Sequence, residues 1–167
     1  MKDWQPAAFD GSIGAVLAKS HLFEGVSADE SAALLDRLGA NVRAYADGSL
    51  LVRLGDTVTR MGVVVEGAVE IGFYDEAGDL ATVNRLEPGD MIAEAIAYAE
   101  EPSVVQATAV GDCRVLWMES ARLLAPTVLA ENPAASLVVA NLVRIVSRKN
   151  VFLNQKAQIL TQRYVRD

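Results

Sequence analysis

The segment GDMIAEAIAY, residues 89–98, interrupts a part of the chain that otherwise has the composition of short β-strands. It follows Pro88 and opens with a Gly-Asp turn, and from Ile92 to Tyr98 it is long enough for one or two helical turns. Its single carboxylate, Glu94, stands among Met, Ile and Ala residues. Two interpretations are open: Glu94 caps the short helix, or it reaches into a pocket and holds a ligand.

Short strands are predicted on both sides of this segment, over residues 41–118. Two segments alternate apolar residues with other residue types, as half-buried strands do: Val69, Ile71 and Phe73, and then Cys113, Val115 and Trp117. The sequence YDEAGD, residues 74–79, predicts a hairpin loop in which Gly78 is available for a positive φ. Many short strands with frequent turns predict a mainly β fold, a barrel or jelly roll.

Helices are predicted before and after the strands. SADE, residues 27–30, is a capping box, and Gly39 ends the helix that follows it. Residues 119–130 predict one helix, and ENP opens the next, with Asn132 as N-cap and Pro133 in the first turn. No Pro or Gly follows Pro133, so this last helix is expected to reach about 34 residues, or about 50 Å.

The last helix carries a heptad-like seam. Residues at alternating spacings of three and four make it up: Val139, Leu142, Val146, Lys149, Leu153, Lys156 and Leu160. One alternative is a helix packed on its own barrel. Because so long a helix must overhang a small barrel, we instead predict a homodimer. The predicted dimer interface consists of Leu142, Val146, Lys149, Leu153 and Leu160.

Composition limits the classes of protein that fit. The chain has 167 residues, of which 51% are hydrophobic, and a net charge of −7. No run approaches the roughly 20 apolar residues of a membrane span, and the N-terminus has no apolar signal-peptide core. A single cysteine fits a reducing cytoplasm, where we expect the protein to be. The acidic balance and the lack of a recognition helix predict that this chain does not itself bind DNA.

Catalytic, metal and cofactor chemistry finds no support in the sequence. The only histidine, His21, precedes the strands, which excludes a histidine-rich metal site in the barrel. Iron–sulfur clusters need about four cysteines, and only Cys113 is present. Cys113 could ligate haem, but its strand alternation favours a buried, inert thiol. We therefore expect a protein that is not an enzyme and that holds no metal or other cofactor.

Taken in order, five stretches of the chain resemble the effector domain of the Crp/Fnr superfamily of bacterial transcription regulators. They are LFEGVS (22–27), YADGSLLVRLGDTVTRMGVVVEGAVEI (45–71), LEPGDMIAEAIAY (86–98), DCRVLWM (112–118) and ENP (131–133). The resemblance implies a double-stranded β-helix, or jelly roll, with flanking helices and a long C-terminal dimerisation helix. It implies a cyclic-nucleotide-binding-like sensor domain over residues 1–132 and the dimerisation helix over residues 133–167.

Members of that superfamily normally continue into a winged helix-turn-helix domain. The last residues, LTQRYVRD (160–167), look like the lead-in to such a domain. The resemblance therefore implies that DNA is bound only through a C-terminal domain missing from this chain. A stand-alone sensor without that output is the alternative.

Cyclic-nucleotide-binding members hold their ligand with a Gly-Glu pair, a short helix and then Arg-Ser or Arg-Thr. Here Ala93 and Glu94 stand at the Gly-Glu positions, and Ser103 and Val104 stand where Arg-Ser would be. No Arg or Lys occurs between Arg85 and Arg114. Losing the cation that pairs with a buried phosphate costs roughly 2–5 kcal/mol, so we expect a ligand other than cyclic AMP.

Further polar residues are candidates for the pocket of such a domain. Besides Ala93, Glu94, Ser103 and Val104, the predicted ligand-binding residues are Arg60, Asn84 and Asn150. The leading hypothesis is a sensor in which an unknown small molecule binds inside the barrel against the long helix. The alternatives are a ligand-free dimerisation module with a vestigial pocket, or a similar domain attached to some other output, such as an enzyme.

Overall fold

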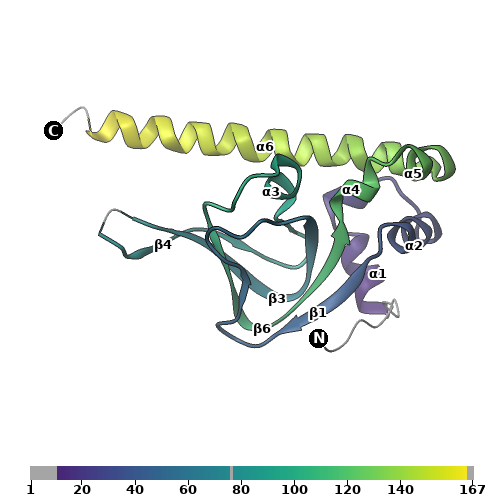
Figure 1. Ribbon diagram of the computed structural model, residues 1–167, viewed down its shortest axis with the longest axis horizontal. Coiled ribbons are helices and arrows are strands. Elements are labelled where there is room, and N and C mark those ends of the chain that lie inside the picture. Colours follow the sequence, from purple (N-terminus) through teal and green to yellow (C-terminus); the bar gives the residue numbers. More distant parts are fainter. Residues whose placement is uncertain (1–10, 76, 165–167) are drawn as a thin grey trace.

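The strands of the chain form one rolled antiparallel sheet (Figure 1). The computed structural model of the protein describes residues 11–75 and 77–164, with side chains up to residue 155. Its strands are β1 (Asn41–Tyr45), β2 (Leu50–Val52), β3 (Arg60–Tyr74), β4 (Leu80–Leu86), β5 (Met91–Ile92) and β6 (Gln106–Glu119). Within these residues the sheet order is β1-β6-β3-β4, with β2 also paired to β6 and β5 to β3. The predicted fold class, mainly β with a jelly-roll-like sheet and flanking helices, is confirmed.

The two long strands, β3 and β6, pair along most of their length and bend together. Their register shifts on both sides of Glu66, next to Gly67, whose φ is +74°. A Cβ on Gly67 would lie 2.4 Å from the carbonyl oxygen of Asp112. Glycine is therefore required at this bulge, where the strands curl into a roll.

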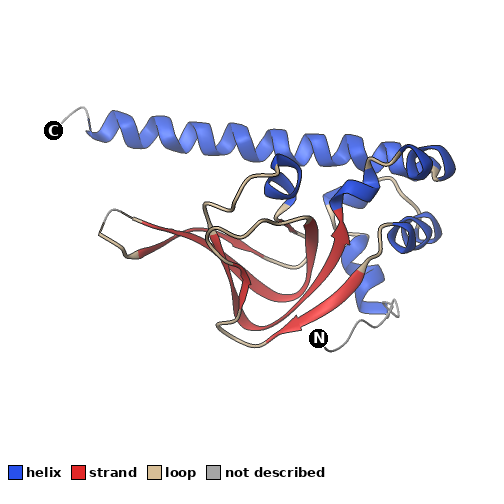
Figure 2. Cartoon of the chain, viewed as in Figure 1, coloured by secondary structure: helices blue, strands red, loops and turns tan. Residues whose placement is uncertain are grey.

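Alternation along β3 and β6 divides the apolar side chains between two cores. Cys113, Val115 and Trp117 are buried inside the roll, as predicted, whereas Leu116 and Met118 point outward and are equally buried. The outward set is covered by the helices drawn in blue in Figure 2. The roll thus encloses one core and shares the other with its helices, because successive strand residues face opposite sides.

The hairpin between β3 and β4 projects beyond the roll (Figure 1). Gly78 has a φ of +86°, and the Asp75 side chain accepts hydrogen bonds from the backbone N–H groups of Ala77 and Asp79. The predicted hairpin loop is therefore confirmed. Phe73, which was predicted on a half-buried face, is 40% exposed because it lies on the projecting part.

The N-terminal helices close one end of the roll. They are α1 (Gly11–Leu17), the 3-10 helix η1 (His21–Phe23) and α2 (Ala28–Arg37). The capping box at the start of α2 is confirmed, since the Ser27 N–H donates to the Glu30 carboxylate and the Glu30 N–H to Ser27 Oγ. Gly39 follows the helix with a φ of +60°, as the sequence predicts.

The region between β6 and the last helix departs from the prediction. The single helix expected over residues 119–130 is wrong, because two short helices, α4 (Ser120–Leu123) and α5 (Pro126–Glu131), take its place. Ala125 is extended, with ψ at 130°, since the residue before a proline is driven out of the helical region. The Asn132 side chain donates its amide to Val128 O, so it caps the end of α5.

The last helix, α6 (Pro133–Tyr164), is 32 residues long and therefore spans about 48 Å. It lies along one side of the roll, with the short helix α3 (Glu94–Ala99) between them, and extends past α3 (Figure 1). Asn141, only 4% exposed, anchors it by donating hydrogen bonds to the carbonyls of Leu22 and Glu24. In the part of the chain that the structure describes, no helix combines the length and apolar character needed to cross a membrane.

Candidate functional site

The segment around Glu94 turns sharply out of the sheet. Ala93 follows the short strand β5 with a φ of 63°, in the left-handed region, and Glu94 then begins α3. A residue with a Cβ rarely adopts this conformation. The turn directs Glu94 toward the inside of the molecule, where it is 4% exposed.

The partner of this buried carboxylate comes from α6. Lys149 Nζ lies 2.6 Å from Glu94 Oε1 and also donates to the Met91 carbonyl at 3.0 Å. The Lys149 side chain remains 39% exposed, so solvent reaches the lysine of this ion pair but hardly reaches the glutamate. A buried charge is stable only when it is paired and hydrogen-bonded, and Lys149 supplies both. The ion pair therefore ties the start of α3 to the middle of α6.

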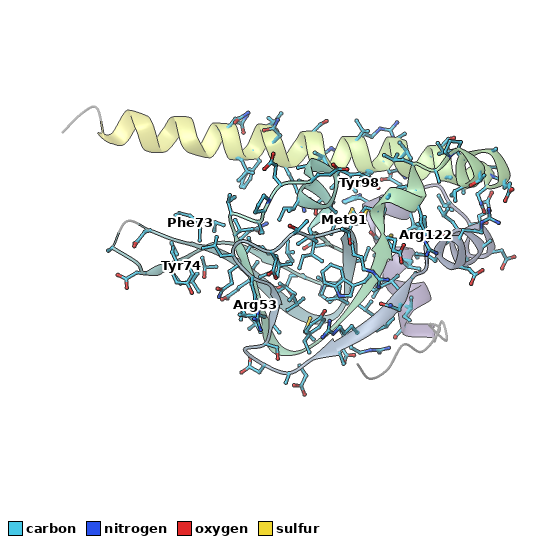
Figure 3. All side chains as sticks on the ribbon, viewed as in Figure 1. Arg53, Phe73, Tyr74, Met91, Tyr98 and Arg122 are labelled. Atoms are coloured by element: carbon cyan, nitrogen blue, oxygen red, sulfur yellow. The ribbon has the colours of Figure 1, made fainter. Side chains whose placement is uncertain are left out.

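A cavity of about 410 Å³ lies beside this ion pair, between the open side of the roll and α6. Figure 3 shows Met91, one of its lining residues, on the side of the roll that faces α6. Its polar lining residues are Asn84, Glu94, Lys149 and Asn150. Its apolar lining residues are Val52, Ile71, Val83, Leu86, Met91, Ile92, Ala93, Ala95, Ile96, Val105, Ala107, Val146 and Leu153. The volume and the apolar walls with a few polar groups are typical of a small-molecule site.

The structure brings together four of the seven residues predicted to bind a ligand. Ala93, Glu94, Asn84 and Asn150 line the cavity, although whether they bind a ligand stays a prediction. The capping interpretation of Glu94 is wrong, because Ala93 holds the N-cap position, no side chain caps α3, and the Glu94 carboxylate pairs with Lys149. Glu94 does line the cavity, and whether it holds a ligand there stays a prediction.

The other three predicted ligand-binding residues lie outside the cavity lining. Arg60 forms an ion pair with Glu119 at 3.0 Å. Ser103 is buried, and its hydroxyl donates to Val105 O at 2.7 Å. Val104 is 77% exposed. The Ser103 hydroxyl is therefore used in a hydrogen bond to the backbone of its own loop, and Val104 is exposed to solvent rather than to the cavity.

Part of the predicted dimer seam packs within its own subunit, and whether the seam also forms a dimer contact stays a prediction. Leu142 is 6% exposed and belongs to the core of its own domain, Val146 packs against that core, and Lys149 pairs with Glu94. Leu153 is 58% exposed and lines the cavity, and the side chain of Leu160 lies outside the described residues. Spacings of three and four are shared by coiled-coil seams and by helices packed on a sheet. Leu142, Val146 and Lys149 each make contacts within the subunit, as the alternative interpretation expects of them.

Lys149 is the cavity residue that the sequence reasoning placed elsewhere. The available signal was a lysine at a position where the seam required an apolar residue. Such a residue needs a buried partner of opposite charge, and Glu94 is the one buried acidic residue in the part of the chain that the structure describes. The lysine on an otherwise apolar seam and the carboxylate in an apolar segment can both be seen in the sequence. Only the fold shows that the two side chains form a pair.

The other end of α3 is fixed to the helix that follows the sheet. The Tyr98 hydroxyl donates to the Ser120 carbonyl oxygen at 2.9 Å, and the same hydroxyl lies 3.9 Å from Met61 Sδ. Burial raises the pKa of Tyr98 to about 12, so the phenol stays protonated and able to donate. Tyr98 lies on the side of the roll nearest α6 (Figure 3). Helix α3 therefore connects the cavity wall with both α6 and α4.

Cys113 lies inside the roll and is 1% exposed. Burial raises the pKa of its thiol, and the nearby Glu66 carboxylate acts in the same direction. A thiolate is the reactive form of cysteine, so this environment favours the buried, inert thiol that the strand alternation indicates.

Comparison with known proteins places this geometry in a family. Residues 42–125, half of the chain, match the family model described as "Cyclic nucleotide-binding domain". They include β3, α3 and all of β6. No curated protein gives a significant match.

Solved structures with the same fold include several transcription regulators. The Thermus thermophilus catabolite activator protein is 24% identical, with a TM-score of 0.73 over 85% of this chain and 63% of that protein. The N-terminal domain of a Streptomyces coelicolor transcriptional regulator is 25% identical, with a TM-score of 0.66 over 84% and 95% of the two chains. The sensor domain of the regulator DNR from Pseudomonas aeruginosa is 20% identical, with a TM-score of 0.63 over 86% and 90%.

The first of these comparisons shows that the chain spans less than two thirds of the Thermus protein. The family model covers the roll and the α3 segment, which hold Glu94 and most of the cavity lining, whereas the lining residues of α6 lie beyond the matched range. The structural neighbours share that roll and include the CAP/Crp-type regulators that the sequence resembles. The chain belongs to the cyclic nucleotide-binding domain family.

Proposed function

We propose that this chain is the effector-sensing and dimerisation part of a Crp/Fnr-type transcription regulator. The observation that supports this most directly is the cavity of about 410 Å³, closed on one side by α3 and on the other by α6. A pure dimerisation module with a vestigial pocket would fill this space with its own apolar side chains. The open volume therefore favours a sensor over that alternative.

The proposed signal passes from the cavity to α6 through α3. Glu94 at the start of α3 holds Lys149 of α6, and Tyr98 near its end holds Ser120 of α4. A ligand beside Glu94 changes the balance between two positions of α3 if it binds one of them more tightly. Helix α6 then carries that shift toward a C-terminal DNA-binding domain. Cytoplasmic location and DNA binding by that further domain are parts of the same proposal.

The homodimer is proposed to form through the outer face of α6. Val143 and Val151 are 58% and 57% exposed. Together with Ala140 and Ser147 they follow spacings of three and four, on the side opposite Leu142. This face has small and β-branched residues and leaves Lys149 in its own subunit, so the lysine no longer interrupts the contact.

Cyclic AMP is not the proposed effector. The loop before β6 offers Ser103 and Val104 where relatives that bind the nucleotide carry an arginine. The cavity's own cation, Lys149, already pairs with Glu94. A cyclic phosphate would therefore enter a site whose positive charge is neutralised.

A thermal-shift panel on this chain tests the sensor proposal. The panel contains cyclic AMP, cyclic GMP, haem, 2-oxoglutarate, aromatic acids, phenols and nucleosides. A ligand at 100 times its Kd adds about 2.7 kcal/mol, which raises Tm by roughly 5–10 °C for a chain of this size. We expect at least one compound to act and cyclic AMP to have no effect.

Two matched variants locate the binding. Val83 lines the cavity and is 39% exposed, whereas Val104 lies outside it and is 77% exposed. Val83→Trp should abolish the shift by filling the cavity, and Val104→Trp should retain it. A shift retained in both variants would assign binding to another surface and contradict the proposed site.

Sedimentation velocity tests the dimer. Val143→Asp places a charge on the outer face of α6 and should convert a dimer to a monomer. Val104→Asp, an equivalent change on an exposed loop, should leave the dimer intact. A wild-type monomer at all accessible concentrations, or a Val143→Asp dimer, would refute this interface.

A further inference from the structure

We infer that the effector is a neutral, mainly apolar small molecule that presents one hydrogen-bonding group, such as a hydroxyl, to the Glu94–Lys149 pair. This inference rests on the proposed function and specifies the chemical class that the same cavity accepts. Three properties of the cavity support it: its charge, its hydrogen-bonding groups and its walls.

The charge of the cavity argues against an ionic ligand. Of the described lining residues only Glu94 and Lys149 are charged, and they neutralise each other at 2.6 Å. An anion would share Lys149 with a carboxylate that is only 4% exposed, leaving one negative charge uncompensated. A cation would likewise compete with Lys149 for Glu94. A neutral molecule keeps the existing pair and avoids both the charge repulsion and the large desolvation cost of burying an ion.

The ion pair still offers hydrogen bonds to a neutral group. The described bonds of Lys149 Nζ go to Glu94 Oε1 and Met91 O, and an ammonium has three N–H donors. A ligand hydroxyl can accept from the remaining donor and donate to the carboxylate. Such a group satisfies both partners without a net charge of its own.

The remaining walls favour an apolar ligand body. Away from the ion pair the cavity is lined by Val52, Ile71, Leu86, Ile92 and Ala107, among other apolar residues. Asn84 and Asn150 are the two further polar residues of the lining, and both side chains are uncharged. A polyhydroxylated or phosphorylated molecule would leave most of its polar groups without partners on these walls. The fit is to a compact aromatic or aliphatic skeleton.

Matched pairs of probes test this charge preference in wild-type protein. They are 4-propylphenol with 4-propylbenzoate and 2-naphthol with 2-naphthoate, measured by isothermal titration calorimetry at neutral pH. Members of a pair share a skeleton and differ mainly in charge. We expect the neutral phenol to bind at least about tenfold more tightly than the carboxylate, because like charges brought together in a binding site are strongly disfavoured.

Glu94→Gln provides the sharpest variant. It removes the competing carboxylate and leaves Lys149 available, so the preference should reverse toward 2-naphthoate. Glu101→Gln, an exposed change on the loop after α3, is the matched control and should leave the wild-type ratio unchanged. If Glu94→Gln fails to fold, the wild-type ratio still decides the question.

The outcomes separate this inference from the proposed function. Tighter binding of the carboxylates than of the phenols to wild-type protein would overturn the neutral ligand class and leave the sensor proposal intact. Binding of cyclic AMP with none of the phenols would do the same. Absence of binding by every probe, neutral and charged, in wild type and in Glu94→Gln would overturn both.

Discussion

Lys149 Nζ and Glu94 Oε1 lie 2.6 Å apart although the two residues are 55 positions apart in the chain. The pair joins the α3 segment, which interrupts the sheet, to the helix that leaves the domain. Glu94 is nearly inaccessible and Lys149 is partly exposed, so the glutamate depends on the lysine more than the reverse. This difference in exposure determines the expected effects of substituting Lys149 and Glu94 on stability.

Replacing Lys149 with methionine should destabilise the domain by about 2 kcal/mol, because Glu94 is left buried without its partner. The double variant Glu94→Gln with Lys149→Met should be more stable than Lys149→Met alone, since the uncompensated charge is gone. Urea denaturation of wild type, both single variants and the double variant measures the coupling. Strictly additive free energies would show that the two side chains do not stabilise each other.

The left-handed conformation of Ala93 predicts a stabilising change. Its φ of 63° costs about 1 kcal/mol in a residue with a Cβ, whereas glycine adopts it freely. After allowing for the greater chain entropy of glycine, Ala93→Gly should stabilise the fold by about 0.5 kcal/mol.

A matched substitution two residues later should have the opposite sign. Ala95 lies within α3, so Ala95→Gly should destabilise by about 0.5–1 kcal/mol. Thermal unfolding of the two variants against wild type measures both effects. Destabilisation by Ala93→Gly as well would mean that the alanine methyl contributes more through packing than its conformation costs.

The capping box at Ser27, the hairpin at Gly78 and the alternation of Cys113, Val115 and Trp117 were predictable because each depends on neighbours a few residues away. The break at Pro126 was also available from local rules, since a residue before proline avoids helix, and one continuous helix was the wrong prediction.

The site was harder to predict than the fold. Glu94 drew attention as a carboxylate in an apolar segment, and Asn84 and Asn150 line the cavity, although their role in binding a ligand stays a prediction. Lys149 was assigned to the dimer seam because its spacing fits a helix packed on a sheet as well as it fits a coiled coil. Whether Lys149 faces its own domain or a second subunit depends on which side of α6 the roll occupies. No pattern of neighbouring residues determines that side.

Tyr98 predicts a specific pH dependence. Its pKa is raised by burial to about 12, above the unfolded value of about 10. The stability that its neutral phenol contributes is therefore complete below about pH 10 and is lost as the pH rises from there through about 12. Above pH 10 the unfolded state binds fewer protons at this group than the folded state does.

Urea denaturation of wild type and Tyr98→Phe at several pH values between 8 and 12 tests this. The pKa of Tyr45 is also raised by burial, so only the difference between the two proteins isolates Tyr98. Tyr98→Phe removes the hydrogen bond to Ser120 O and should cost about 1 kcal/mol at pH 8, with the difference shrinking toward pH 12. A difference that stays constant across this range would exclude Tyr98 as the titrating group.

Asn141 should be the strongest single anchor of α6. Its amide donates to the carbonyls of Leu22 and Glu24 at 3.1 and 2.9 Å and is almost fully buried. Asn141→Leu keeps the branched shape of the side chain but leaves both carbonyls without this donor, so we expect a loss of about 2–3 kcal/mol. Asn154→Leu, on an exposed turn of the same helix, should change stability by less than about 0.5 kcal/mol. Similar costs for the two variants would show that α6 is held by its apolar contacts alone, with no specific contribution from the Asn141 hydrogen bonds.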